Sequence, residues 1–531
     1  MNLPKPQYTT FPSLINDIEK GQIKIPQFQR DFVWSIEKSA ELMDSVIKGY
    51  PIGTFIFWKT KDRLRSIRNI GGFQLPEPPK GDFIEYVLDG QQRLTSIYAT
   101  LKGLTIEREE KNENFSEMYV DLLAEEDEKI VILDIEGKDP QNIIKLTDLI
   151  FGGLTLLVAL PTEHHKKLEN YKRRIETYSF STILVENVSI DIATEIFTRI
   201  NVGGKSLSVF EIMVAKTYDV EREFDLSEKY DELISRLEEV NYETISDSTV
   251  LQTVSVLLKR ECSKKVILKL DKSSFIDIWP DTVDAIERAI DYFRSYYRIP
   301  VSQLLPYSAL IVPFSYFFYH HKDKPKGDMQ RFLQGFYWRL SLTERYSHSL
   351  ETRIAQDITR IDDILKNKHP KYDYSVDVSP EYIYENGWFS ASRSYIKAIL
   401  SLFAYFEPKS FIDHSLVHVS NYWLKQANSK NYHHFFPKAF LRKNKVEEFA
   451  INHILNITIV DDHLNKREIG SKAPSKYMKS FQVENPIIDK TMKTHLIDDI
   501  DDYGIFDDDY EKFLKMRSIK ISEELKKRVL V

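Results

Sequence analysis

The sequence predicts an α+β protein that is divided into several domains. The chain has 531 residues, more than the roughly 250 to 300 residues at which one hydrophobic core stops growing. Short β-like runs alternate with helical patterns in the first part of the chain, and helical patterns dominate afterwards. Hydrophobic residues make up 42% of the chain, which is enough for ordinary globular cores.

The first predicted domain covers residues 1–225 and is α+β. Its predicted strands are short runs rich in β-branched and aromatic residues, bounded by turn-forming residues. These runs are TFIFW (54–58), FIEYVLD (83–89), KIVILDI (129–135) and STILVENV (181–188).

Residues 226–375 are predicted to form a helical scaffold. Apolar residues recur there at helical spacing, as in DELISRLEEV and DAIERAIDYFRSYY. Such helices bury their apolar stripes against one another. The third predicted domain covers residues 376–531, where the helical run SYIKAILSLFAYF precedes a basic segment rich in histidine.

Cysteine content and hydropathy exclude several classes of protein. The single cysteine, Cys262, excludes internal disulfides and cysteine zinc sites, and we expect it to be a small buried apolar residue. No window approaches the ~18 apolar residues of a membrane span, and the first residues lack a signal-peptide pattern. We therefore expect a soluble, cytoplasmic protein with no membrane partner.

The charge distribution indicates a local site for nucleic acid. The net charge is −7, yet residues 421–480 hold 11 Lys and Arg against 5 Asp and Glu. The acidic stretch 498–511 has eight carboxylates and is predicted to be a solvated surface. Alternatively, these carboxylates mimic phosphates and occupy the basic site until nucleic acid displaces them.

The basic segment contains the side chains that phosphodiester hydrolysis needs. We predict a small ββα unit in which His433 and His434 open a hairpin, Asn456 lies in the run ILNITIV, and Asn465 begins a short helix. A neutral imidazole can act as base near neutral pH, and a hard divalent cation can neutralise charge on the phosphate. Adjacent residues of a strand point to opposite faces, so only one of the two histidines can be the base.

These residues resemble the HNH, or ββα-metal, endonuclease superfamily, in the form found in GmrSD-like modification-dependent (type IV) restriction proteins. The resemblance implies that His434 activates water, that Asn456 orients the base or the phosphate, and that His433 and Asn465 hold Mg²⁺ or Mn²⁺. The first ligand position is often Asp in this family, and the softer imidazole of His433 shifts the preference toward Mn²⁺. His463 is an alternative ligand to Asn465.

Basic side chains around these residues are expected to attract phosphates of any sequence, with an affinity that falls as salt rises. They are Lys438, Arg442, Lys443, Lys466, Arg467, Lys472 and Lys476.

A second candidate site lies in YVLDGQQRLT (86–95). A β-run ends at Asp89, Gly90 permits a sharp turn, and a helix begins at Gln91 and Gln92, so that free backbone N–H groups face a phosphate. Arg93 offers a planar fork for phosphate, and Asp89 can accept from a ribose hydroxyl. No P-loop pattern is present. The residues alone leave open a plain structural pair of Asp89 and Arg93 in an ordinary turn.

Two further segments can complete this site. IPQFQRDFVW (25–34) contributes Gln29 and Arg30. IFTRINVGGKSLSVFE (196–211) offers a second possible place for an anion, formed by Arg199, Asn201, Gly203, Gly204 and Lys205. The latter ends in a predicted capping box, Ser208 to Glu211, and Phe32 and Trp34 are expected to belong to the core.

With these flanking segments, the string DGQQR resembles the DGQQR-type ParB/sulfiredoxin-like domain of GmrSD-like proteins, over about residues 10–220. The resemblance implies binding or hydrolysis of a nucleoside triphosphate and sensing of modified DNA, through Asp89, Gly90, Gln91, Gln92 and Arg93.

Together these features predict a nucleotide-regulated, divalent-metal-dependent DNA endonuclease directed at modified or foreign DNA in anti-phage defence. One alternative is a nucleotide-switched DNA-binding module whose nuclease centre is inactive. Another is a nuclease that cleaves RNA as a growth-arresting toxin. A homodimer would let two centres cut both strands.

Overall fold

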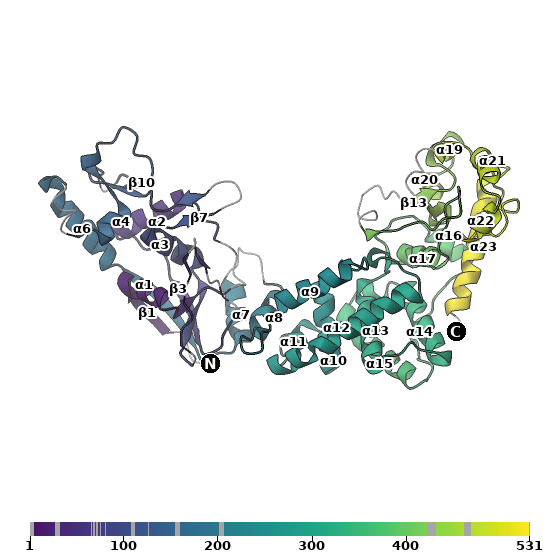
Figure 1. The fold of residues 1–531 in the computed structure, drawn as a ribbon, viewed down its shortest axis with the longest axis horizontal. Coiled ribbons are helices and arrows are strands. Elements are labelled where there is room, and N and C mark those ends of the chain that lie inside the picture. Colours follow the sequence, from purple (N-terminus) through teal and green to yellow (C-terminus); the bar gives the residue numbers. More distant parts are fainter. Residues whose placement is uncertain are drawn as a thin grey trace. The chain divides into compact units, whose positions relative to one another are not determined.

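The computed structural model describes most of the chain, and all structural statements below concern that part. The described residues are 5–26, 32–64, 66, 69–70, 73–74, 76–79, 81–107, 112–125, 127–153, 160–200, 207–421, 432–460 and 469–529. The chain forms two compact units, Met1–Leu226 and Ser227–Val531, and each is described by itself (Figure 1). The division into three domains, with boundaries after residues 225 and 375, stays a prediction.

A mixed five-stranded sheet forms the centre of the first unit, with the strand order β1-β12-β3-β6-β2. Its strands are β1 (Lys5–Thr10), β2 (Ile23–Lys24), β3 (Phe55–Thr60), β6 (Ile84–Asp89) and β12 (Ser179–Glu186). The pairs β12–β3 and β2–β6 are parallel, whereas β1–β12 and β3–β6 are antiparallel. Strands β3, β6 and β12 confirm three of the four strands predicted from the sequence.

The fourth predicted strand, 129–135, is much shorter than expected. Only β10 (Val131–Ile132) forms there, in a separate sheet with β9 (Tyr119–Asp121) and β11 (Ile143–Lys145). The backbone N–H groups of Ile130 and Val131 donate to Asp44 Oδ1, at 2.7 and 3.0 Å. A side chain from a helix thus takes the place of a strand partner.

Two small hairpins pair β4 (Asn69–Ile70) with β5 (Phe73–Gln74) and β7 (Thr105–Ile106) with β8 (Glu113–Asn114).

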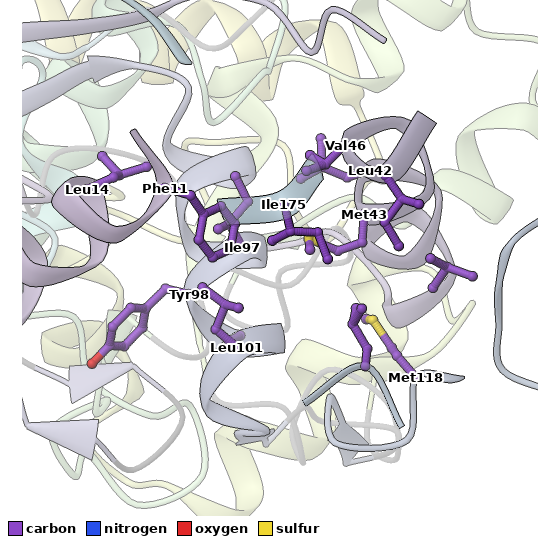
Figure 2. Packing of buried hydrophobic residues seen from close by; sticks show 14 of the residues in the cluster. Phe11, Leu14, Leu42, Met43, Val46, Ile97, Tyr98, Leu101, Met118 and Ile175 are labelled. Atoms are coloured by element: carbon purple, nitrogen blue, oxygen red, sulfur yellow. The ribbon is translucent and has the colours of Figure 1, made fainter. Parts of the chain in front are cut away.

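Helices pack against this sheet, and their buried apolar side chains form the core of the first unit (Figure 2). The core includes Leu42 and Met43 of α2 and Ile97 and Leu101 of α3. Phe32 and Trp34 are partly buried and pack against it, as predicted. The helices are α1 (Phe11–Glu19), α2 (Ile36–Lys48), α3 (Gln91–Lys102), α4 (Leu146–Phe151), α6 (His165–Glu176), α7 (Ile190–Ile200) and α8 (Val209–Thr217).

The second unit begins with a helical assembly, in agreement with the helical patterns of the sequence. Its helices are α9 (Leu226–Glu238), α10 (Asp247–Lys259), α11 (Lys264–Ile267), α12 (Lys272–Ser295), α13 (Ile311–His320), α14 (Gly327–Ser341) and α15 (Leu350–Leu365). The aromatic side chains that these helices carry are core, as expected: Phe293 lies 4.6 Å from Phe314 between ring centroids. Cys262 is buried, as predicted, and burial raises the pKa of its thiol to about 12.

The rest of the second unit contains a short two-stranded sheet surrounded by helices (Figure 1). Strand β13 (Tyr432–His434) pairs antiparallel with β14 (Ile457–Ile459). The surrounding helices are α16 (Pro380–Glu385), α17 (Ser394–Tyr405), α19 (Lys438–Lys443), α20 (Glu448–Ile451), α21 (Pro474–Glu484), α22 (Ile488–Lys493) and α23 (Tyr510–Val529). Among the described helices, none has the length and hydropathy needed to cross a membrane.

Candidate active site

The two adjacent histidines lie on β13 and differ in burial. In the antiparallel pair, His433 lies opposite Thr458 and His434 lies opposite Ile457. His433 is buried, with 3% of its surface exposed, whereas His434 is half-buried. This difference agrees with the alternation of side chains along a strand, so His434 is the more accessible of the two.

The connection between the two strands is more elaborate than the sequence predicts. The sequence predicts a hairpin at His433 and His434, whereas the link between its strands contains both α19 and α20. Asn456 also lies outside the strand, in a 3₁₀ turn, Ile454–Asn456, that directly precedes β14. The two strands therefore meet through a compact helical insertion.

The side chain of Asn456 joins the two ends of this connection. Its Oδ1 accepts the N–H of Phe436 (2.8 Å), and its Nδ2 donates to the carbonyls of Phe436 (3.0 Å) and Ile451 (3.3 Å). Asn456 is completely buried, so the amide groups of this side chain satisfy backbone groups that would otherwise lose their hydrogen bonds. The turn after His434 is thereby held against the start of β14.

Asn452 is a site residue that the sequence analysis missed. Its Oδ1 lies 3.1 Å from His434 Nε2, and its Nδ2 donates to the carbonyl of Phe389 at 3.0 Å. The second bond fixes the orientation of the amide, so an oxygen faces the imidazole and the proton of neutral His434 resides on Nε2. Nδ1 then carries the lone pair. Phe389 is far from Asn452 in the sequence, and no local pattern indicates the contact.

Burial keeps the imidazoles of this region neutral. It lowers the pKa of His434 to about 4, and the neighbouring charge of Lys438 contributes to this shift. Burial likewise lowers the pKa of His433 to about 3. Near neutral pH both rings are uncharged, which is the form that accepts a proton or binds a metal.

Positive side chains lie near His434, although some of them are engaged. Lys438 and Arg442 on α19 both act electrostatically on His434, as does Glu448. Arg442 forms an ion pair with Glu448, with an Nη2 to Oε1 distance of 2.7 Å. Three of the other predicted phosphate contacts are exposed, namely Lys443, Lys472 and Lys476. The remaining two, Lys466 and Arg467, lie outside the described residues.

The predicted metal site is only partly covered by the structure. His433 Nδ1 lies 3.5 Å from Thr458 Oγ1, and its Nε2 has no hydrogen-bond partner among the described residues, so this ring suits a ligand role. Asn465 and the alternative ligand His463 lie outside the described residues. Within the described ranges, no three His, Cys, Asp or Glu side chains come together to hold a metal.

A buried arginine, also missed in the sequence, supports the turn that carries Asn456. Arg517 on α23 is fully buried and donates to the carbonyls of Leu455 (2.7 Å) and His495 (3.2 Å). Its guanidinium lies over the ring of Phe403, 4.8 Å from the centroid. Burial lowers the pKa of Arg517 to about 9.

The carboxylates of the acidic stretch 498–511 are largely exposed, as predicted for a solvated surface, whereas most of the apolar side chains between them are buried. Several of its carboxylates accept hydrogen bonds, and two of them bind side chains outside the stretch. Asp508 accepts the N–H of Ser475 (2.9 Å) and its hydroxyl (2.8 Å) next to the start of α21, and Asp498 pairs with Lys520 at 2.8 Å. The alternative role as a phosphate mimic stays a prediction.

In the first unit, Arg93 has structural partners. Its Nη1 donates to the carbonyl of Ile52 (2.7 Å), and its Nη2 donates to the carbonyl of Thr54 (3.0 Å) and to Asp89 Oδ2 (3.2 Å). A Cβ at Gly53 would lie 2.3 Å from Arg93 Nη1, so the turn approaches the guanidinium too closely for a side chain. The structure thus contains the structural Asp89–Arg93 pair that the sequence left open.

The DGQQR segment also contacts one of its predicted neighbours. Gln92 Oε1 accepts the N–H groups of Val33 (2.8 Å) and Trp34 (3.3 Å). Gln91 and Gln92 are buried, and Gly90 has a φ of 93° that permits the turn into α3. The hydrogen bonds of Gln92 bring residues 33–34 to the start of this helix.

The remaining predicted nucleotide contacts are less well placed. Gln29, Arg30, Asn201, Gly203, Gly204 and Lys205 lie outside the described residues. Arg199 is 78% exposed and pairs with Glu195 at 2.6 Å. The predicted capping box of α8 is confirmed, since the side chain of Ser208 accepts a backbone N–H of the helix and that of Glu211 accepts the N–H of the cap residue.

Comparison with known proteins finds a family match in the first unit and a relative along most of the chain. An uncharacterized protein of Methanocaldococcus jannaschii is 25% identical over 524 residues, covering 88% of this chain and 86% of that protein. The likeness therefore extends into both compact units. Residues 11–218 match the family described as GmrSD restriction endonuclease, N-terminal domain. The first compact unit is therefore similar, over these residues, to the N-terminal domain of GmrSD restriction endonucleases.

Proposed function

We propose that the chain is a divalent-metal-dependent DNA endonuclease that hydrolyses phosphodiester bonds at His434 and restricts modified or foreign DNA. The observation that carries the proposal is the contact between His434 Nε2 and Asn452 Oδ1, 3.1 Å. It leaves Nδ1 of a neutral imidazole as the basic nitrogen, on a strand that Asn456 holds in place. The GmrSD-type N-terminal domain supports the restriction of modified DNA.

In this reaction His434 Nδ1 takes a proton from a water molecule as the water oxygen forms a bond to phosphorus. The bond from phosphorus to the leaving oxygen breaks, and that oxygen takes a proton from solvent. Lys438 and the exposed Lys443 attract the phosphate backbone. A divalent ion held by His433 and Asn465 would neutralise charge on the phosphate and on the leaving oxygen.

The test compares H434A with H348A, which removes an exposed histidine of the same unit. Nicking of plasmid DNA with Mg²⁺ or Mn²⁺ should fall by about 10²- to 10⁴-fold in H434A and stay unchanged in H348A. DNA binding measured in EDTA should be the same in both. Cleavage by H434A at the wild-type rate would rule out the proposed base.

The same assay separates the rival functions. A DNA-binding module with an inactive centre predicts that the wild type shifts DNA in gels and leaves no nicks with either metal. An RNA-cleaving toxin predicts rapid digestion of RNA with DNA left intact. Digestion of phage DNA with and without its base modifications then tests whether the chain restricts modified DNA.

We further propose that the turn at Asp89 binds a nucleoside triphosphate that regulates cleavage. The left-handed Gly90 turn leads directly into the N-terminus of α3, where backbone N–H groups suit a phosphate. Because Arg93 is already bonded to backbone carbonyls, the backbone and Asp89 would carry the recognition. D89N keeps an acceptor for Arg93 and removes the charge.

Nucleotide binding and turnover in D89N are therefore expected to fall while the fold is kept. Equilibrium dialysis with labelled ATP and GTP measures binding, and phosphate release measures turnover. Wild-type protein that binds neither nucleotide would contradict a nucleotide site and would leave the nuclease proposal standing.

A further inference from the structure

Three large aromatic side chains are exposed together in the second unit. Tyr384, Trp388 and Phe449, here called the aromatic surface, are 41%, 39% and 37% exposed. The rings of Trp388 and Phe449 are stacked, with centroids 6.2 Å apart and planes 21° apart, and Tyr384 meets Phe449 edge to face at 6.2 Å. Exposed rings gathered in one place mark a binding surface more often than scattered ones do.

The rings rest on a rigid support. His453 is fully buried, its ring stacks on that of Tyr384 at 5.1 Å, and its Nε2 bonds to the carbonyl of Tyr384 at 2.8 Å. A Cβ at Gly387 would lie 2.1 Å from the ring of His453, so the chain beside Trp388 passes directly against the imidazole. Because the rings are already in place, little ordering is needed when a ligand binds.

The aromatic surface adjoins the proposed catalytic base. Asn452, the neighbour of His453, contacts His434 Nε2 at 3.1 Å. Phe389, the neighbour of Trp388, exchanges two hydrogen bonds with Asn452: its N–H donates to the Asn452 carbonyl at 2.9 Å, and its carbonyl accepts from Asn452 Nδ2 at 3.0 Å. Both segments that carry the surface therefore converge on the residue that orients His434.

Two cationic side chains and one carboxylate lie near the same place. Glu448, the neighbour of Phe449, pairs with Arg442, and Arg442 and Lys438 act electrostatically on His434. A nucleic acid offers both chemistries at once, since its phosphates are negative and its bases have apolar faces. A purely apolar protein partner would offer these cations no counter-charge. The phosphate that we propose is cleaved at His434 would supply one.

We infer that Tyr384, Trp388 and Phe449 form a stacking surface for an unpaired nucleobase next to the phosphate that is cleaved. This inference rests on the proposed nuclease function and adds to it that the strand is locally unpaired when bound, because a paired base offers its face only to its neighbours in the stack. Each base presents such a face, so the surface tolerates different sequences.

The test uses full-length protein in EDTA, where no cleavage occurs, and a fluorescent single-stranded oligonucleotide. W388A should weaken binding roughly tenfold, which is within the range of one lost base–aromatic stack, and W388F should bind nearly as the wild type does. Blunt duplex DNA of the same length should be affected less. V483A is the control, since Val483 is an exposed apolar residue on α21 of the same unit.

A second variant separates stacking from apolar burial. F449L keeps an apolar side chain of similar size and removes the flat ring, so it should lose single-strand affinity while its thermal stability stays close to that of the wild type. Wild-type affinity of F449L and W388A would overturn the inference.

An interface between two copies of the chain is the competing outcome. Sedimentation of the wild type as a dimer and of W388A as a monomer, with unchanged oligonucleotide binding, would also overturn the inference. None of these measurements depends on plasmid nicking. They can therefore contradict the inference about the aromatic surface without contradicting the proposed nuclease function. If the wild-type protein does not nick plasmid DNA with either metal, the result would instead contradict the proposed function itself.

Discussion

At the scale of single residues, the orientation of His434 depends on Asn452, a neighbour that the sequence analysis did not single out. Asn452 contacts Nε2 through an oxygen whose position is fixed by a second bond, to Phe389. His434, Asn456 and Asn465 could be singled out in the sequence because their order resembles a family motif. Asn452 could not, because its partner comes from a segment 63 positions away.

We predict that N452A lowers kcat for nicking by about 10- to 100-fold and leaves KM nearly unchanged. The reason is that the imidazole loses the contact that holds its ring and its tautomer, and small errors in the position of a catalytic group have effects of this size. N444A, at an exposed asparagine in the same connection, is the matched control. Equal losses in kcat for both variants would refute a positioning role.

Arg93 is a residue that the sequence analysis did single out, as part of DGQQR, but its guanidinium is bound by backbone carbonyls and by Asp89 within the fold. We predict that G53A lowers the free energy of unfolding by about 1–3 kcal/mol more than G81A does. Both glycines have positive φ, 90° and 91°, but a Cβ at Gly53 strikes Arg93 whereas one at Gly81 meets open space. Urea denaturation of both variants measures the difference, and equal values would contradict a close Arg93 contact.

At the scale of elements, most helices and the main strands follow from hydrophobic periodicity, and the exceptions have identifiable causes. Strands β3, β6 and β12 lie where alternation and β-branched residues predict them. In the run at 129–135 only Val131 and Ile132 form a strand, and Asp44 accepts the backbone N–H groups of Ile130 and Val131. A periodic pattern contains no information about such a side chain from another helix.

Helix α23 carries Arg517, which supports the turn at Leu455, and it also carries a group of paired charges centred on Glu524. Glu524 accepts hydrogen bonds from Lys527 and Arg528, both at 2.8 Å. Burial alone would raise the pKa of Glu524, but these bonds and the nearby positive charges outweigh it and lower the pKa to about 2. Because the folded pKa is depressed, the stabilisation is present above the ordinary value of 4.5 and is lost as pH falls toward 2.

We therefore predict that E524Q lowers Tm relative to the wild type at pH 6 and that the difference shrinks as pH falls from 4.5 toward 2. E523Q, at the exposed neighbouring position, should show no such pH-dependent difference. Melting curves followed by circular dichroism test both variants, and a difference between E524Q and wild type that stays constant with pH would contradict the assigned network.

At the scale of the whole molecule, a segment similar to the GmrSD N-terminal domain and a histidine-containing two-stranded sheet occur in one chain, and the likeness to the archaeal protein extends into both units. If the first unit regulates the second, the two activities should be separable by mutation. We predict that D89N abolishes any effect of nucleotide on nicking while a basal, metal-dependent rate remains, and that H434A abolishes nicking while nucleotide binding remains.

Nicking assays with and without nucleotide, paired with binding by equilibrium dialysis, check this prediction. A nucleotide effect on nicking that persists in D89N would place the regulation elsewhere. Loss of both activities in both variants would argue against two separable sites.

The amino-acid order alone was sufficient to predict a multidomain α+β protein, the strand carrying His433 and His434, and the glycine turn at Asp89, because these depend on residues close together in the chain. Only the three-dimensional structure revealed that Asn452 orients His434, that Arg517 supports the turn at Leu455, and that Arg93 binds carbonyls before β3. Each of these contacts joins residues that are distant in sequence, and it forms because buried polar groups must find partners wherever the packed chain brings them.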